Sequence, residues 1–425
     1  MGKRRRSAKR PGAAPRRPPP YLCPAMISKP QLDLFLLGLA RRPHYAEACR
    51  ASERILRHAE GKGADALVKK RFFHEPEHVV EYRLAHLRVV TRAYFDKILH
   101  SFVRLTREED FVVEFPSDAD SGALMERWPE TGSFVEWWNR YGWKTLFTEP
   151  NGLLALVHDD EGFMPVFFPA RAVVDVRPGK YALVSETPER FLLITPRQCV
   201  RYERQKNNDF AVRVLGEYLW HEAPAWILGG EPTSLDTPGV FRSFLDGAVD
   251  WWDEALTEYS DKQAALKMHV YPEKWMYGAV CNQCHGAGKL SGFGSPKTCV
   301  ACGGEGMATG PFSIVHVRPP KPHEPAPPLP PAGYIQKDLA AVEFLARDVN
   351  EHLRRGLAAV HFEHLFDVPL NQSGYAKALD RAETDAFLYK VLRHAVRGLL
   401  EPMGRFVLRR KDAPTFRFRL SNHAQ

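Results

Sequence analysis

Two copies of one short cysteine motif lie in the second half of the chain. The first reads CNQCHGAG and supplies Cys281 and Cys284, and the second reads CVACGGEG and supplies Cys299 and Cys302. Both fit the pattern CxxCxGxG, in which a tight turn brings two thiolates to one side of a metal ion. Glycine after the second cysteine tolerates a positive φ, so that backbone N–H groups can approach the sulfurs. These residue types and spacings favour metal binding.

The ion that such a set of ligands favours is zinc. Structural zinc takes four ligands in a tetrahedron, and four thiolates leave no position for a reacting water molecule. We therefore predict one structural Zn²⁺ ion held by Cys281, Cys284, Cys299 and Cys302. The alternatives are that His285 replaces one cysteine, or that the four thiols are unrelated. Seven cysteines in all, an odd number, suit a reducing compartment better than disulfides. Three of them are expected to take no part in the site: Cys23, Cys49 and Cys199.

A catalytic constellation is not found in the sequence. The motifs GxSxG and GxGxxG do not occur, and Gly288-Lys289 lacks the upstream glycine of a phosphate-binding loop. The pair Asp159-Asp160 could bind a metal ion in a nuclease, but it falls between two predicted strands, where a solvated turn is the alternative. We predict no catalytic residue and no enzymatic activity.

The basic residues are concentrated at the N-terminus. Residues 1–20 hold eight Lys and Arg side chains and no acidic one, which equals the net charge of +8 for all 425 residues. The remaining chain is therefore electrically balanced. A tail of this composition is expected to be disordered and able to touch phosphates without sequence preference, or to be solvated without a specific partner, or to lie upstream of a start at Met26.

The elements that must position the cysteines are two long helices. Helical spacing dominates residues 26–119, and short apolar runs separated by turn signals predict an antiparallel β region over residues 152–226. Thr237 as a cap and Pro238 at the first helical position predict a helix that reaches residue 270. A second helix is predicted over 336–366, and a third ends before Pro402. The apolar stripes of such helices are also typical of a plain helix bundle.

The predicted fold class is α+β, and the linear order gives six segments. These are a basic disordered tail (1–25), an α then β region (26–236), a first long helix (237–270), a zinc-binding segment with a Pro-rich linker (271–333), a second long helix (334–366), and a loop, third helix and C-terminal segment (367–425). The 44% apolar content is sufficient for a sizeable core, and no apolar run approaches the length of a membrane span.

Three segments resemble the portal proteins of tailed bacteriophages, in particular a subgroup with zinc-binding cysteines. They are APAWILGGEP (Ala223 to Pro232), SFLDGAVDWWDEALTEYSDKQAALKMHVYPEKW (Ser243 to Trp275) and PLNQSGYAKALDRAETDAFL (Pro369 to Leu388), together with the cysteine motifs. The cysteine motifs are also similar to those of J-domain chaperones, but the His-Pro-Asp tripeptide of that family is absent.

The resemblance to portal proteins implies a portal-like fold. It would have an α-rich wing with a small β region, two stem helices that bracket a zinc-binding clip, and a channel loop. The channel-loop candidates are Asp367, Val368, Pro369, Leu370, Asn371, Gln372 and Ser373.

The function implied is a homo-oligomeric ring, a dodecamer by expectation, at a capsid vertex. Double-stranded DNA would pass through its channel during genome packaging and ejection. Its partners would be the terminase packaging motor and the capsid, tail and neck proteins, with no membrane, and its location the virion or the host cytoplasm. The alternatives are a zinc-containing adaptor or chaperone-like protein that binds partner chains, and a nucleic-acid enzyme whose zinc segment grips DNA.

Overall fold

The computed structural model divides the chain into two compact units. Unit 1 comprises Met1–Pro43 and Val173–Ala225, and unit 2 comprises His44–Ala172 and Trp226–Gln425. Each unit is thus assembled from segments that are distant in sequence. The structure describes residues 27–69, 75, 77–106, 111–114, 134–159, 162–206, 209–270, 274–277, 281, 283–285, 287–290, 296–300, 304, 314–317, 323, 325, 332–335, 339–366, 374–408 and 415–418.

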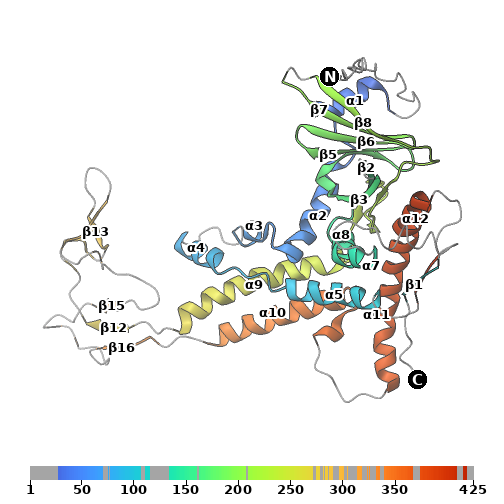
Figure 1. Ribbon diagram of the computed structural model, residues 1–425. Helices are drawn as coiled ribbons and strands as arrows, with labels where there is room; N and C mark the ends of the chain where they lie inside the picture. Colours follow the sequence, from blue (N-terminus) through green and yellow to red (C-terminus); the bar gives the residue numbers. More distant parts are fainter. Residues whose placement is uncertain are drawn as a thin grey trace, which may run out of the picture. The chain divides into compact units, whose positions relative to one another are not determined.

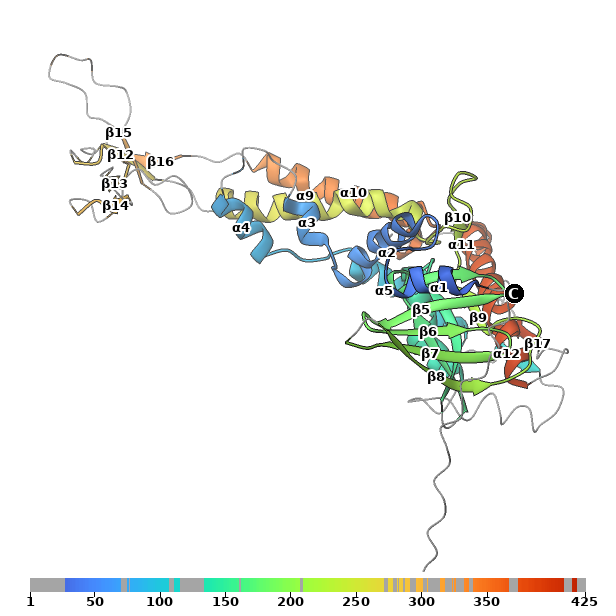
Figure 2. The same cartoon turned by 90° about the horizontal axis from the view of Figure 1, so that it is seen from above.

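Unit 1 is an antiparallel sheet with one helix packed on it. The strands are neighbours in sequence order, and Figure 2 shows β5 to β8 in this order; they are β4 (Val173–Arg177), β5 (Tyr181–Thr187), β6 (Arg190–Ile194), β7 (Gln198–Arg204) and β8 (Phe210–Glu217). Helix α1 (Lys29–Leu36) places Leu32, Phe35 and Leu36 in one buried cluster with residues of the sheet. The prediction of an antiparallel β region is confirmed.

Unit 2 is mainly helical. Its N-terminal part contains α2 (Tyr45–Glu60), α3 (Ala64–Lys69), α4 (Glu77–Ala85), α5 (Arg92–Leu105), α7 (Phe134–Trp137), the π turn η1 (Trp138–Gly142) and α8 (Trp143–Thr148). This agrees with the predicted α-rich opening. The hairpin of β2 (Leu153–Asp159) and β3 (Gly162–Phe168) follows, with β9 (Ala225–Ile227) beside β2 and the 3₁₀ turn η2 (Ala170–Ala172) after β3.

The two longest helices of the central part are α9 (Asp246–Val270) and α10 (Ala340–Ala358), which lie side by side and run in opposite directions (Figures 1 and 2). Their contact is close because Gly356 has no side chain: a Cβ there would lie 2.3 Å from Nε1 of the buried Trp252. The opposite side of α9 contacts α2, α3 and α4. The predicted apolar stripes form this core, with Val249, Trp252, Leu256, Val349, Leu353 and Leu357 all buried.

The predicted start of the first long helix at Thr237 is wrong, because the helix begins at Asp246. Pro238 and Gly239 instead occupy a turn closed by the bond from Val240 N–H to Thr237 O, with φ of +80° at Gly239. Proline followed by glycine favours this type II turn more strongly than a helix start. The turn lies between the short strands β10 (Glu231–Pro232) and β11 (Phe241–Arg242), which pair antiparallel.

The second long helix ends at Ala358, earlier than the predicted Phe366. His361 adopts a left-handed φ of 61°, and the N–H groups of Phe362 and His361 donate to the carbonyls of Leu357 and Ala358. These two bonds form a Schellman cap, which normally uses glycine at the left-handed position. The side chain of Thr384, on helix α11 (Gly374–Ala395), donates to the carbonyl of His361, so that the cap is also tied to the next helix. The turn η3 (Glu363–Leu365) follows.

The third helix was predicted to end before Pro402, and this is wrong, because the helix continues beyond that residue. Helix α11 (Gly374–Ala395) passes through the π turn η4 (Val396–Leu400) into α12 (Glu401–Leu408). The N–H of Glu401 donates to the carbonyl of Val396, five residues earlier. This wider turn directly before Pro402 relaxes the α-helical bonding pattern that a proline ring and its missing N–H would disrupt.

Several short strands complete unit 2. In one sheet β12 (Lys274–Tyr277) lies between β15 (Ile314–Val317) and β16 (Ala332–Tyr334), and β1 (Phe111–Glu114) pairs with β17 (Thr415–Phe418). Across the helices that the structure describes, none combines the length and apolar character needed to cross a membrane.

Candidate metal centre

Three of the four predicted ligands come together. The sulfur atoms of Cys281, Cys284 and Cys299 all lie within 4.8 Å of one another. The Sγ atoms of Cys281 and Cys299 are 3.7 Å apart. Zinc–sulfur bonds of about 2.3 Å in a tetrahedron separate two sulfurs by about 3.8 Å, so this spacing fits a shared zinc ion.

A small hairpin brings the two cysteine motifs together. Strand β13 (Lys289–Leu290) follows the first motif, and it pairs antiparallel with β14 (Lys297–Thr298), which precedes the second. The N–H of Cys299 donates to the carbonyl of Gly288, directly linking the two turns. The hairpin therefore places Cys299 opposite the first cysteine pair.

The two motif glycines that the structure describes act as the sequence predicted. Gly288 has a φ of +69°, and its N–H lies 3.3 Å from the Sγ of Cys284, to which it donates. Gly304 has a φ of +87°, and a Cβ there would lie 2.7 Å from Cγ2 of Thr298. Both positions need glycine because of their backbone conformation, and the second also because of the space available.

The backbone also favours a thiolate at Cys281. Hydrogen bonds from the backbone of Cys284, and then of Gln283, hold the pKa of the Cys281 thiol below its usual range. The thiolate is the form that binds metal. The donor set, the sulfur spacing and the hydrogen-bonded turns together suit a soft metal ion.

The remaining predicted site residues are placed as follows. His285 has a left-handed φ of 49° and an exposed side chain, and it is not part of the cysteine group. Asp159 ends β2 and pairs with Gly162. Three of the predictions lie outside the described residues: Cys302, Asp160 and the channel-loop candidates 367–373.

No protein-family model matches this chain, and no curated protein matches it.

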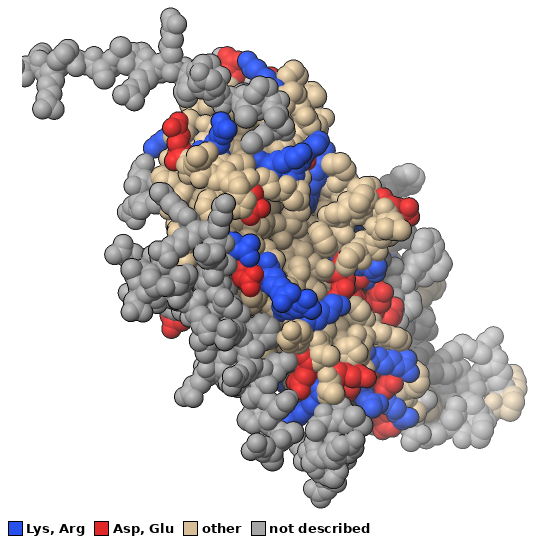
Figure 3. All heavy atoms as spheres, turned by 90° about the vertical axis from the view of Figure 1, so that its right-hand side faces the viewer, with Lys and Arg blue, Asp and Glu red and all other residues tan. Residues whose placement is uncertain are grey.

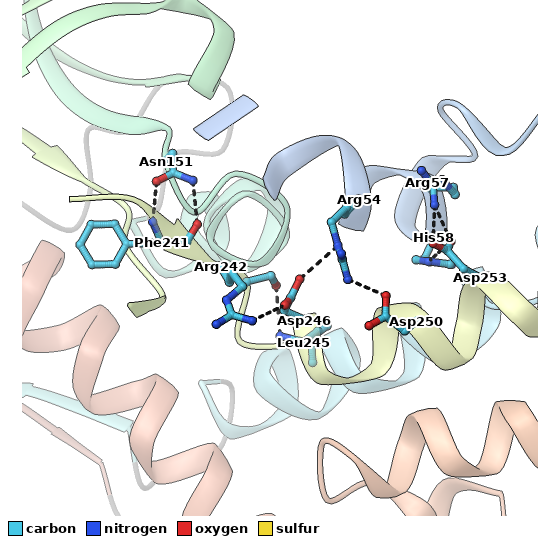
Figure 4. Close-up of polar contacts among 11 residues, drawn as sticks. Arg54, Arg57, His58, Asn151, Phe241, Arg242, Leu245, Asp246, Asp250 and Asp253 are labelled. Atoms are coloured by element: carbon cyan, nitrogen blue, oxygen red, sulfur yellow. Dashed lines mark hydrogen bonds and ion pairs between the residues drawn. The ribbon is translucent and has the colours of Figure 1, made fainter. Parts of the chain in front are cut away.

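A row of carboxylates on α9 holds the helices of unit 2 together (Figure 4). Arg54 of α2 lies between Asp246 and Asp250, with nitrogen–oxygen distances of 3.5 and 2.8 Å. One turn further on, Arg57 Nη1 lies 2.5 Å from Oδ2 of Asp253. Asn151 bonds both backbone groups of Phe241 and thereby fixes β11 just before α9 begins. This polar seam positions the N-terminal half of α9.

A buried histidine lies within this seam. His58 Nε2 is 3.2 Å from Oδ1 of Asp253, and Nδ1 is 3.0 Å from the hydroxyl of Thr91. Burial lowers the pKa of His58 and outweighs the opposing effect of Asp253. Burial alone would raise the pKa of Asp253, but hydrogen bonds from His58 and Arg57 hold it below its usual range.

A second group of metal-ligating side chains was missed from the sequence. Glu258 on α9 meets Asp348 and His352 on α10, and their ligand atoms lie within 4.8 Å of one another. The i, i+4 spacing of Asp348 and His352 is a signal that places two ligand types on one helix face. The third residue could be found only once the pairing of the two helices was known.

Proposed function

We propose that this chain is a portal protein of a tailed bacteriophage, found in the virion or the host cytoplasm. In this proposal it is one subunit of a ring, most simply a dodecamer, whose axial channel passes double-stranded DNA during genome packaging and ejection. The observation that carries the proposal is the side-by-side packing of α9 and α10, two helices that bracket the cysteine segment in the chain. That is the order of stem helix, clip and stem helix to which the sequence resemblance points.

The exposed apolar side chains of the long helices support assembly into a ring. Phe344 on α10 is 60% exposed, and Leu339, directly before that helix, is 53% exposed. Leu266 on α9 is also exposed. Exposed large apolar side chains are candidates for a surface that another protein covers. In the proposed ring a neighbouring copy covers them, and α9 and α10 serve as the stem.

In this proposal one structural Zn²⁺ ion stiffens the clip. Its ligands would be Cys281, Cys284 and Cys299, with Cys302 as the fourth. Zinc binding supplies the folding free energy that a short, loop-rich segment cannot obtain from an apolar core. A clip stiffened in this way would present fixed loops to the packaging motor, and the ion would take no part in catalysis.

The distribution of charge suits a channel for DNA. Basic and acidic side chains are interspersed on the described part of the face shown in Figure 3. Among the described residues, charged side chains also pair with each other, as Arg201 does with Glu186 and Arg355 with Glu351. A surface dominated by basic groups would hold phosphates tightly, whereas DNA must slide through a portal.

The test is the mass of the purified full-length protein in solution, by analytical ultracentrifugation, together with negative-stain images. Rings of about twelve subunits would support the proposal. A monomer or dimer that binds partner chains would instead favour the zinc-containing adaptor.

A matched pair of variants makes this test specific to the exposed face. Phe344→Glu should shift the rings to smaller species, because it places a charge where the neighbouring copy packs. Phe344→Leu keeps an apolar side chain and should still form rings. Neither change should alter the free energy of unfolding of the subunit by more than about 0.5 kcal/mol, since Phe344 is exposed. Rings that persist in Phe344→Glu would refute this assignment of the interface.

A further inference from the structure

Three side chains of the kinds that bind metal ions meet between α9 and α10. The Nδ1 atom of His352 lies 2.8 Å from Oε2 of Glu258, and the ligand atom of Asp348 lies within 4.8 Å of both. The cluster is largely shielded from water, since the Glu258 side chain is 8% exposed and that of His352 is 14% exposed. It joins two helices that are far apart in the sequence, so it is a product of the tertiary fold.

Apart from His352, the acidic members of the cluster have no basic partner among the residues that the structure describes. In the part of the chain that the structure describes, neither Glu258 nor Asp348 forms an ion pair with Lys or Arg, and Arg355 pairs with Glu351. A buried carboxylate is costly unless a positive charge or hydrogen bonds compensate for it. A divalent cation would provide the compensating charge.

The imidazole of the cluster is held in a fixed orientation. The ring of His352 stacks on that of Trp251, with centroids 5.8 Å apart and an angle of 27° between the planes. The guanidinium of Arg355 covers the Trp251 ring at 5.2 Å. Contacts that orient a ligating histidine strengthen metal binding, because the ring loses less freedom when the ion binds.

We infer that Glu258, Asp348 and His352 bind a divalent first-row transition-metal ion such as Zn²⁺, which ties α9 to α10. Two carboxylates and one imidazole are a donor set that such ions accept. Asp348 and His352 are one turn apart on α10 and chelate from one helix, while Glu258 supplies the link to the other. The inference rests on this cluster alone and does not depend on the proposed function or on the cysteine site.

The experiment measures zinc bound to the full-length protein. The protein is stripped with a chelator, loaded with Zn²⁺ and desalted, and its zinc content is measured by inductively coupled plasma mass spectrometry. The variants His352→Ala and nearly isosteric Glu258→Gln should each bind one zinc ion fewer per chain than the wild type. The matched control is Glu343→Gln, which removes one carboxylate from an exposed position on α10 and should bind as much zinc as the wild type.

Cobalt separates this site from the cysteines. Co²⁺ bound by thiolates gives intense charge-transfer absorption, whereas Co²⁺ bound by carboxylates and imidazole gives only weak bands. The His352→Ala protein should keep the intense absorption and lose the weaker second component of the titration. Equal zinc contents in the wild type, His352→Ala and Glu258→Gln would overturn the inference and leave the cluster as a proton-sharing pair beside a histidine. Far-ultraviolet circular dichroism checks that both variants are folded.

Discussion

The helices around α9 and the cysteine segment are stabilised in different ways. On α9 the side chains of Val249, Trp252 and Leu256 are wholly buried against neighbouring helices. In the described part of residues 281–304, the buried positions are Cys284, Gly288 and Cys299, while Val300 is 90% exposed. The first region has an apolar core, and the second has a cluster of thiols.

The two regions therefore obtain their folding free energy from different sources. Burying apolar area contributes about 25 cal/mol for each Å², which sustains helices that meet along their whole length. A hairpin of two-residue strands offers too little area, so cross-linking through a metal ion is the available alternative. Substitutions in one region should therefore leave the stability of the other largely unchanged.

The largest effect is expected from Trp252→Ala. Trp252 is fully buried between α9 and α10, so its truncation should lower the free energy of unfolding by about 3–5 kcal/mol. Urea unfolding followed by circular dichroism measures the change. The adjacent Trp251→Ala is the matched control, since Trp251 is 37% exposed and should cost less than half as much. Equal losses of unfolding free energy in the two variants would contradict the assignment of Trp252, and not Trp251, to the buried core.

A smaller loss is expected from Gly356→Ala. The added methyl group would lie 2.3 Å from the Trp252 indole nitrogen, and therefore α10 must move away from α9. Overpacking of this kind costs about 1–3 kcal/mol. Gly398→Ala is the control, because its nearest neighbour would be at 3.9 Å. The midpoint of thermal unfolding should fall for Gly356→Ala and stay near the wild-type value for the control.

The pH dependence of stability should report on the polar seam. Burial lowers the pKa of His58 from its ordinary value of 6.5, so the unfolded chain takes up this proton at a higher pH than the folded chain. Stability is therefore complete above pH 6.5 and falls as the pH decreases through that value. The lowered pKa of Asp253 acts only at still lower pH, below its ordinary 3.8.

The variant His58→Gln isolates this contribution. It should flatten the dependence of unfolding free energy on pH between about 7 and 5, even if the protein is less stable overall. Urea titrations at a series of pH values measure the slope. A slope unchanged from that of the wild type would show that other groups dominate this range.

The smallest effect on the helices is expected from Cys281→Ser. It should release zinc from the cysteine segment while changing the unfolding free energy of the helical region by no more than about 0.5 kcal/mol. Metal analysis gives the first result, and circular dichroism at the helical wavelength gives the second. A large fall in helical stability would break the separation between the two regions, and unchanged zinc content would remove Cys281 from the ligand set.

Local sequence signals predicted the elements and the thiol cluster better than the element boundaries. Periodic apolar residues located α9 and α10, and the repeated CxxCxGxG motif located Cys281, Cys284 and Cys299. Pro238 was misassigned because proline serves both helix starts and type II turns, and the choice depended on Gly239. The end of α10 was missed because His361, rather than glycine, takes the left-handed position.

The cluster of Glu258, Asp348 and His352 shows a different limit. Two of its three members are local, since Asp348 and His352 share one helix face, but Glu258 joins them only through the pairing of α9 with α10. The three-dimensional register of two helices cannot be read from either helix alone. Glycine at position 356 sets that register, because it admits the Trp252 ring.

The π turn at Val396–Leu400 has a consequence for helical phase. It inserts one residue into the helix, and each residue of an α-helix turns the chain by about 100°. The buried side chains Val391 and Leu392 before it, and Met403 and Phe406 after it, therefore lie on stripes that a regular helix would not align in the same way. Deleting Gly398 alone would therefore regularise the helix and leave Met403 and Phe406 in their present packing, whereas a regular helix that kept every residue would rotate both by about 100°. At this point the packing of the helix depends on the number of residues as much as on their types.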